Sequence, residues 1–333
     1  MFSVSFLCLV WASFVTSTAP IREGEGMSIT DASNAGPPLS VRLRSQLGGY
    51  GFLMPWLLGF VVLTLGPAVS SFYLSLTDFG LMGPANWVGA ENYVRIASDD
   101  PRFWTAMRVT FTFVLLSVPL KLMFALAIAV ALNKGLRGLT VFRAIFYLPS
   151  LVGGSVAIAV LWRQVFAGDG VLNQVLAALF GYEGPSWISN PSTSLYTLVL
   201  LAAWQFGSSM IIFLAGLRQI PQDMYEAASI DGASRSRQFF KITLPLLTPV
   251  IFFNAVILTI DAFKAFTSAF VVSDGSGGPI DTTLFYTLYL YQEAFTNFRF
   301  GYASALAWVL VVIIAIFTTL SFMSAKYWVH YDD

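Results

Sequence analysis

Residues 216–247 read GLRQIPQDMYEAASIDGASRSRQFFKITLPLL, and this polar stretch separates two long apolar segments of the chain. Its first half carries helix signals. Pro221 suits the first turn of a helix, and Asp223 and Glu226 are favoured near the positive end of the helix dipole. Gly232 can adopt the left-handed conformation that ends a helix. We therefore predict a short helix that stops at Gly232.

The second half of the stretch predicts another short helix, which Ser234 can cap and Pro245 limits. In the first helix, Ala227 and Ala228 are compact helix formers, so another protein could approach them closely. The stretch is thus a helix–turn–helix with a surface suited to a partner. A structural connector rich in good helix formers explains the same residues, and residue chemistry alone leaves both interpretations open.

The regions on either side of this loop are those of a membrane protein. Of the 333 residues, 56% are hydrophobic and 11% are charged, against about a quarter charged in soluble domains. About 20 mostly apolar residues are needed to cross a bilayer as a helix. The chain has six such segments: 50–72, 103–132, 142–165, 194–217, 246–271 and 301–326. We predict an all-α, polytopic membrane protein with six transmembrane helices.

Basic residues predict the orientation of these helices. With the N-terminus inside, ten basic residues lie in the cytoplasmic segments: Arg42, Arg44, Lys134, Arg137, Arg143, Arg218, Arg235, Arg237, Lys241 and Lys326. The opposite segments hold four, with a fifth near one edge: Arg95, Arg102, Arg108 and Arg299, and Arg163. The loop 167–193 has no Lys or Arg, which suits the external face. The positive-inside rule places both termini in the cytoplasm.

We predict an N-terminal leader over residues 1–48 and a transmembrane domain over 49–333. The polar loop lies within this domain at about 218–245. Residues 2–15 are apolar but short for a span, and they lack the basic start of a secretory signal. We therefore expect translation to begin at Met27, so that residues 1–26 are absent from the mature chain.

Several functional classes are disfavoured by composition. The formal net charge is zero, so no basic surface predicts a nucleic-acid partner. Cys8 is the only cysteine and His330 the only histidine, which disfavours histidine catalysis and a cysteine- or histidine-based metal site. The sequence has no Gly-x-x-x-x-Gly-Lys-[Ser/Thr] phosphate-binding loop.

Charged residues within the apolar segments are candidates for a translocation path. A charge at the bilayer centre costs about 2.5–3.5 kcal/mol on insertion scales, so such residues usually face protein or water. Lys121, Asp261 and Lys264 are of this kind, and Asn254, Asp261, Lys264 and Ser268 recur at helical spacing on one face. Either this stripe lines a path, or Asp261 pairs with a lysine simply to hold the helices together.

Aromatic and amide side chains in the fourth segment could complete a sugar site. Gln205 could supply hydrogen bonds to hydroxyl groups, and Trp204 an aromatic platform. A lone Trp in a span is more often packed or lipid-facing. Tyr286, Tyr289 and Tyr291 lie in an external segment, where they could be interfacial anchors.

The run Glu226-Ala227-Ala228, Asp231-Gly232-Ala233 and Ile242-Thr243-Leu244-Pro245 resembles the EAA loop of binding-protein-dependent ABC importers. With Phe239-Phe240-Lys241 and Leu246-Leu247 it is most similar to permeases of the maltose and glycerol-3-phosphate carbohydrate-uptake family. Residues 138–149 and 161–173 resemble that family's third span. The turn 273–279 departs from the family's Thr-Gly-Gly-Gly-Pro pattern, which weakens inference about an external gate.

This resemblance implies a type I importer (MetI-like) permease fold in the bacterial inner membrane, with the loop docking on a separate ATPase. The implied partners are a second homologous permease, two ATPase subunits, an extracytoplasmic solute-binding protein and the lipid bilayer. No cofactor is expected in this chain, since ATP and Mg²⁺ belong to the ATPase subunits. The implied coupling residues are Tyr225, Glu226, Ala227, Ala228, Asp231, Gly232, Ala233, Leu244 and Pro245.

The resemblance implies that the solute is a carbohydrate or polyol, but other functions stay open. EAA loops also occur in importers of amino acids, polyamines and anions. An ion-coupled secondary transporter would rest on intramembrane acids, and Asp261 is the only acid well inside a span. A membrane enzyme has no nucleophile–base pair or metal-ligand cluster to support it.

Overall fold

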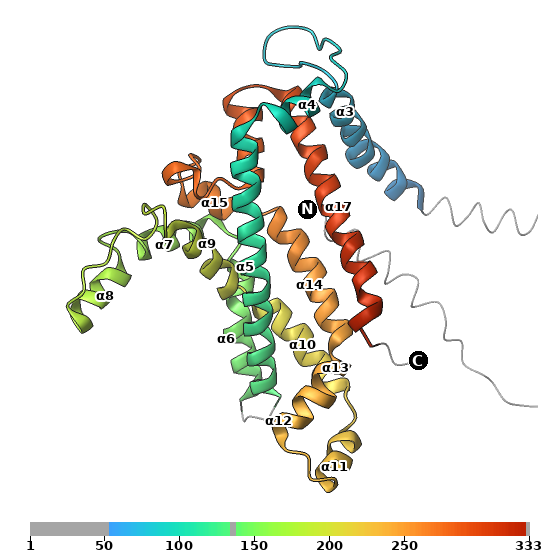
Figure 1. Cartoon of the computed structure of the whole chain (residues 1–333), viewed down its shortest axis with the longest axis vertical. Coiled ribbons are helices and arrows are strands. Elements are labelled where there is room, and N and C mark those ends of the chain that lie inside the picture. Colours follow the sequence, from blue (N-terminus) through green and yellow to red (C-terminus); the bar gives the residue numbers. More distant parts are fainter. Residues whose placement is uncertain (1–52, 134–137, 331–333) are drawn as a thin grey trace, which may run out of the picture. The chain divides into compact units, whose positions relative to one another are not determined.

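The computed structural model describes residues 53–133 and 138–330, and these form helices and loops with one isolated β-bridge between Thr77 and Trp87. Helical elements follow one another along the chain (Figure 1). They are η1 (Val61–Leu65), α3 (Gly66–Ser75), α4 (Glu91–Ser98), α5 (Pro101–Leu132), α6 (Leu139–Val152), α7 (Val156–Val165), α8 (Val171–Phe180), α9 (Ser194–Trp204), α10 (Gly207–Gln219), α11 (Gln222–Ile230), α12 (Arg235–Gln238), η2 (Phe239–Thr243), α13 (Leu244–Leu246), α14 (Thr248–Phe263), α15 (Thr267–Val272), η3 (Pro279–Asp281), α16 (Tyr286–Tyr291), η4 (Gln292–Thr296) and α17 (Phe300–Trp328). The predicted leader and its start at Met27 lie outside the described residues.

Three helices are long and apolar enough to cross a membrane without a break: Leu53–Ser75, α5 and α17. Three further pairs of helices pass the same test together, although each pair is bent. The bends are 98° between α6 and α7, 42° between α9 and α10, and 62° between the α12–α13 segment and α14. Length and composition therefore allow three to six crossings among the described residues.

The third, fourth and fifth predicted spans are not continuous helices. In the fourth, α9 ends at Trp204 and α10 begins at Gly207. Gly153–Ser155 separates α6 from α7, so 142–165 is two helices at a large angle. In the fifth segment α14 ends at Phe263, and Lys264–Phe266 precede α15. Backbone breaks at membrane depth are tolerated where they face protein or a water-filled cavity, because the freed backbone groups can be satisfied there.

Helix α5 is the element around which the other helices pack, and it contributes to two separate apolar cores. Its first half packs with α9, α14, α16 and α17 around Phe103, Phe113 and Tyr286. Its second half packs with α10, where Ala125 and Ala129 are fully buried. Small residues four apart allow two helices to approach closely. The two cores therefore divide α5 into a Pro101 half and a Leu132 half.

A carboxylate ties together three elements at the Pro101 end of α5. Asp100 caps α5 by accepting a hydrogen bond from the Phe103 N–H at 3.0 Å. It also accepts hydrogen bonds from the hydroxyl of Tyr289 on α16, at 2.5 Å, and of Tyr302 on α17. Partial burial raises the pKa of Asp100, but these hydrogen bonds outweigh burial and hold the pKa below its ordinary value.

Candidate functional sites: an intramembrane cavity and a helix–turn–helix loop

The loop predicted to bind a partner forms a helix–turn–helix. Helix α11 begins at Gln222, with Pro221 as the residue before it, and ends at Ile230. Gly232 has a φ of +75°, as the sequence predicted, and the Ala233 N–H donates to the Ala228 carbonyl at 2.9 Å to close the helix end. The turn is therefore set by residues that local sequence signals identify.

The second arm of the loop also follows its prediction at the start. Ser234 caps α12 by accepting from the Arg237 N–H at 3.4 Å. The helical arm then continues through η2 and α13 and ends at Leu246. Pro245 lies inside this last turn with Leu244, one residue before the end, and the 62° bend into α14 follows.

Side-chain hydrogen bonds join the two arms of the loop, and an apolar contact fixes the loop to the core at the Leu132 half of α5. The Tyr225 hydroxyl lies 2.8 Å from the Thr243 hydroxyl, and the Tyr225 side chain packs against the apolar core of the Leu132 half. The Gln238 amide donates to the Ser229 hydroxyl at 2.9 Å and to the Ala233 carbonyl at 3.2 Å. Helix α11 is therefore tied directly to α12 and to η2.

The outward surface of the loop carries apolar side chains that no part of the described chain covers. Met224 and Phe240 are exposed, and Ile230 is 87% exposed. Glu226, Ala227 and Asp231 are also exposed. Among the described residues, Glu226 belongs to no ion pair. An apolar and acidic surface of this kind is suited to a protein partner.

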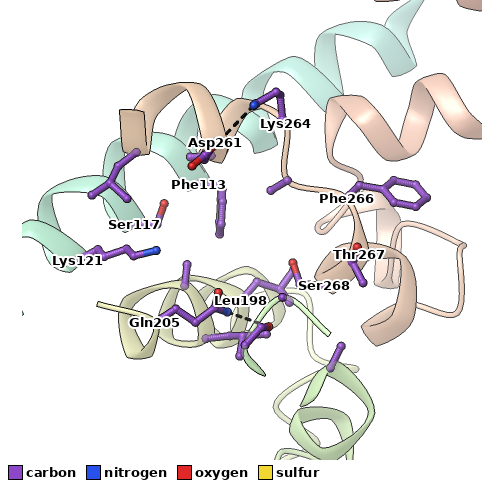
Figure 2. Close-up of a pocket in the computed structure, with 18 of the residues that line it drawn as sticks. Phe113, Ser117, Lys121, Leu198, Gln205, Asp261, Lys264, Phe266, Thr267 and Ser268 are labelled. Carbon is purple, nitrogen blue, oxygen red and sulfur yellow. Dashed lines mark hydrogen bonds and ion pairs between the residues drawn. The ribbon is translucent and has the colours of Figure 1, made fainter. Parts of the chain in front are cut away.

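A cavity of about 340 Å³ lies among the helix breaks (Figure 2). Small-molecule sites typically have about 300–1,000 Å³. The second, third, fourth and fifth predicted spans all line it. Its polar side chains are those of Ser117, Lys121, Ser155, Gln205, Asp261, Lys264, Thr267 and Ser268. The structure thus brings four of the predicted path residues, Lys121, Gln205, Asp261 and Lys264, to one cavity.

The charged pair in this cavity is open to its surroundings. The Lys264 ammonium lies 3.3 Å from the Asp261 carboxylate, and the two side chains are 50% and 62% exposed. Lys121 reaches the same cavity from α5 (Figure 2). The cavity therefore holds two ammonium groups and one carboxylate.

Two predicted path residues do not line the cavity. Asn254 is buried, and its amide donates to the Val250 carbonyl of its own helix at 2.9 Å. Trp204 lies beside Trp162, with the ring centroids 6.1 Å apart, and is absent from the lining. The predicted helical stripe is interrupted, because α14 ends at Phe263, before Ser268. A role for Asn254 in the path stays a prediction.

The sequence did not predict that the break between α6 and α7 lines the cavity. Gly153 accepts a hydrogen bond from the Gln205 amide at 3.1 Å, and the Ser150 hydroxyl donates to the Gln205 carbonyl at 3.1 Å. A Cβ on Gly207 would lie 2.4 Å from the Phe146 carbonyl oxygen, so this close approach needs glycine. The pair Gly153-Gly154 was a sequence signal for the break. Only the fold shows that Gln205 contacts the chain at this break.

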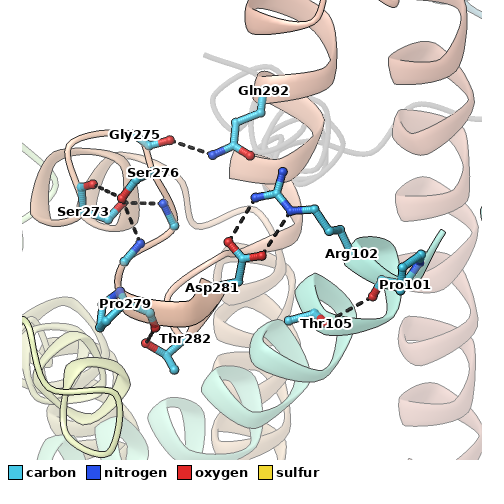
Figure 3. Close-up of polar contacts among 12 residues, drawn as sticks. Pro101, Arg102, Thr105, Ser273, Gly275, Ser276, Pro279, Asp281, Thr282 and Gln292 are labelled. Atoms are coloured by element: carbon cyan, nitrogen blue, oxygen red, sulfur yellow. Dashed lines mark hydrogen bonds and ion pairs between the residues drawn. The ribbon is translucent and has the colours of Figure 1, made fainter.

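The turn after α15 is held rigidly at the Pro101 end of α5 (Figure 3). Arg102 donates to both carboxylate oxygens of Asp281, at 3.0 and 3.1 Å. The Gln292 amide donates to the Gly275 carbonyl at 2.7 Å. Ile280, between these anchors, has a φ of +54° and is 85% exposed. A left-handed conformation costs about 1–2 kcal/mol for an L-residue, so the anchors must offset strain at this position.

Comparisons with known proteins agree on one family. Residues 27–329 match the model of the binding-protein-dependent transport system inner membrane component. The chain is 50% identical over 87% of its length to a probable ABC transporter permease, YesP of Bacillus subtilis, covering 94% of that protein. It is 33% identical over 86% of its length to the lactose transport permease LacF of Rhizobium radiobacter, covering 97%.

A solved structure shows the same fold. The chain superimposes with a TM-score of 0.73 on a chain of a bacterial alginate ABC transporter in complex with its periplasmic protein. The alignment covers 87% of this chain and 98% of that one, at 20% identity. The chain, with its broken helices and its helix–turn–helix loop, therefore has the fold of an ABC transporter permease.

Proposed function

Since this chain belongs to the family of binding-protein-dependent transport system inner membrane components, we propose that it forms half of the path through which an ATP-driven importer moves a carbohydrate or polyol. It is a multi-pass membrane protein and a transport subunit of an ABC importer, not an enzyme. One observation carries the substrate class: hydroxyl, amide and charged groups gather in a cavity among otherwise apolar helices. Such groups can exchange hydrogen bonds with sugar hydroxyls.

The names of relatives support a sugar. Besides the lactose permease, the chain is 31% identical to an arabinooligosaccharide permease of Bacillus subtilis and 33% identical to a trehalose/maltose permease of Thermococcus litoralis. The residues that would touch the solute are Lys121, Gln205, Asp261 and Lys264 together with Ser117 and Ser268.

The exposed ion pair supports a second permease subunit. A charge facing lipid is costly, so the face that carries Asp261 and Lys264 must meet protein or water. A second, homologous permease opposite this face would enclose a hydrated path between the two chains. An extracytoplasmic binding protein would deliver the solute, and two ATPase subunits would bind ATP and Mg²⁺ and close on the loops that contain α11.

Reconstitution tests the proposed function. The chain, a second permease, the ATPase subunits and the binding protein are placed in vesicles, and entry of radiolabelled lactose, maltose and arabinooligosaccharides is measured. We expect uptake of a carbohydrate that needs both ATP and the binding protein. Amino acids and polyamines serve as control solutes, and their uptake in place of sugars would overturn the substrate class. Uptake driven by an ion gradient without ATP would contradict the transport mechanism.

The proposed topology has six crossings with both termini in the cytoplasm of a bacterial cell, in its inner membrane. It is supported by the segregation of basic residues: Arg235 and Arg237 lie in the loop at the Leu132 end of α5, and Arg102 and Arg299 flank the helices at the Pro101 end. The helix–turn–helix would then face the cytoplasm, and 167–193 would face outward.

Cysteine labelling tests this orientation. In a Cys8→Ser background, Ser192→Cys and Ser236→Cys place single thiols in exposed positions of the two proposed faces. We expect a membrane-impermeant maleimide to label Ser192→Cys in intact cells and to label Ser236→Cys only after permeabilisation. The reverse pattern would invert the topology, and labelling of both in intact cells would contradict the number of crossings.

A further inference from the structure

Helix α8 is apolar over most of its surface and yet exposed. It reads VLNQVLAALF, and it follows the end of α7, on which it packs (Figure 1). Val175, Leu179 and Phe180 are 45%, 69% and 74% exposed. Ten residues are about half the number needed to cross a bilayer, so α8 is not a span. A helix that is hydrophobic all round belongs in an apolar environment, not in water.

The two polar side chains of α8 are turned back into the loop. Asn173 is buried, and its amide donates to the carbonyl groups of Gly168, Gly184 and Pro185 at 2.8–3.0 Å, while its oxygen accepts from the Trp187 indole at 2.7 Å. The Gln174 amide donates to the Asp169 carbonyl at 2.9 Å. These bonds fix α8 to its own loop and leave Gln174, whose amide is bonded to the backbone, as the only exposed polar side chain among residues 171–180.

Charge is excluded from the whole helix. No charged residue occurs between Asp169 and Glu183, and Tyr182 lies two residues after the end of the helix at Phe180. A water-exposed helix would carry charges on its open face, and a helix held to anionic headgroups by charge would carry Lys or Arg. A surface without either fits the apolar side of the membrane interface, where Tyr and Trp are enriched at the boundary.

Lipid explains the exposure better than a protein partner does. At 100° per residue, Val175 and Ala177 lie on nearly opposite sides of the helix, and both are exposed. A second protein covers one face of a helix, whereas acyl chains can surround it. The exposed apolar surface also continues along the preceding helix α7, at Val156, Val160 and Leu161.

We propose that α8 is an interfacial anchor that lies in the bilayer beside the bent pair of α6 and α7, with phospholipid acyl chains as its occupant. Asn173 is its positioning residue, because it ties the helix to the backbone of the surrounding loop. The contact with lipid is independent of the proposed orientation, and only the assignment to the outer leaflet rests on it.

Spin-label accessibility tests the anchor in the complete importer. Val175→Cys, Ala177→Cys and Leu179→Cys are each made in the Cys8→Ser background, labelled with a nitroxide and reconstituted in vesicles of phosphatidylethanolamine and phosphatidylglycerol. Collision of the nitroxide with oxygen, which concentrates in lipid, is compared with collision with a water-soluble nickel chelate. Ser192→Cys, in the same loop and exposed, is the matched control.

We expect oxygen collision to exceed nickel collision several-fold at all three α8 positions and the reverse at Ser192→Cys. A water-like ratio at the α8 positions would overturn the proposal. Low collision with both reagents at Val175→Cys or Ala177→Cys would also overturn it, in favour of a protein contact. The same vesicles are assayed for ATP-driven uptake, so a failed anchor is distinguished from a failed importer, and the labelling of Ser192→Cys in cells separately decides the leaflet.

Discussion

Gly232→Val and Glu226→Lys are expected to abolish ATP-driven uptake by releasing the ATPase subunits, while membrane insertion is retained. Gly232 has a φ of +75°, so a β-branched side chain there costs about 1–2 kcal/mol in backbone strain. Nothing lies within 4 Å of a Cβ at this position, so the new side chain would meet no part of the described chain. It would instead project where the partner is proposed to dock.

Glu226→Lys acts on the same surface through charge. Glu226 is exposed on α11, and in the described part of the chain it has no ion-pair partner. A carboxylate in that position can accept a charge-assisted hydrogen bond from the ATPase or from the loop itself. A charge-assisted hydrogen bond is about twice as strong as one between neutral groups. A lysine at this position would repel the donor that the carboxylate attracts.

Co-purification of the ATPase with the permease pair is the direct measurement. Gly181→Val is the matched control for strain, because Gly181 also follows a helix with a positive φ (+65°) and has no neighbour within 4 Å. Glu91→Lys, in the first turn of α4, is the matched control for charge. A second permease with a similar loop would retain half the docking surface, so both loops are also mutated together. Full ATPase retention with full binding-protein-stimulated hydrolysis and uptake would refute the assignment of the loop.

The loop could be predicted in detail because its signals are local. Gly232 sets the left-handed turn, and Ser234 caps the helix after it, whatever surrounds them. Local signals do not predict the role of Tyr225, whose hydroxyl forms a hydrogen bond with the Thr243 hydroxyl on the other arm. That contact depends on how the arms fold back, which no pattern of spacing specifies.

The broken spans were harder to predict because hydropathy averages over about 20 residues. Pro149 is the obvious breaker in the third span, yet α6 continues through it to Val152 and breaks at Gly153. The position is chosen by tertiary packing: Gly153 meets Gln205, and Gly207 meets the backbone at Phe146. Gly153 and Gln205 are 52 residues apart in sequence, so neither break can be recognised from the other.

The composition of the cavity was predicted only in part for a related reason. Helical spacing placed Asn254 and Asp261 on one face, but spacing cannot show that an amide bonds the carbonyl four residues earlier. Asp261 and Lys264 were identified because charges are costly in a membrane wherever they lie. Ser117, on the other hand, carried no signal, since a lone serine is common in membrane helices.

Neutralising Asp261 is expected to reduce uptake roughly ten- to a hundredfold, because losing a hydrogen bond to a charged group costs about 1.5–3 kcal/mol. Asp261→Asn would leave Lys264 and Lys121 as two like charges in the cavity. In the alternative, the pair with Lys264 only holds the helices together. An ion pair this exposed contributes about 0–1 kcal/mol to stability in water, so the assembled complex should survive its loss if the path is hydrated.

Uptake and assembly are therefore measured side by side on the purified complex. Asp169→Asn, an exposed carboxylate outside the cavity, is the control and should transport normally. The exchange Asp261→Lys with Lys264→Asp separates the two roles, because it preserves the pair but moves each charge. Reduced uptake in Asp261→Asn and in the exchange, with assembly intact in both, would support a role in the path. Restored uptake in the exchange would assign the pair to structure, and normal uptake in both Asp261→Ala and Lys264→Ala would remove it from the path.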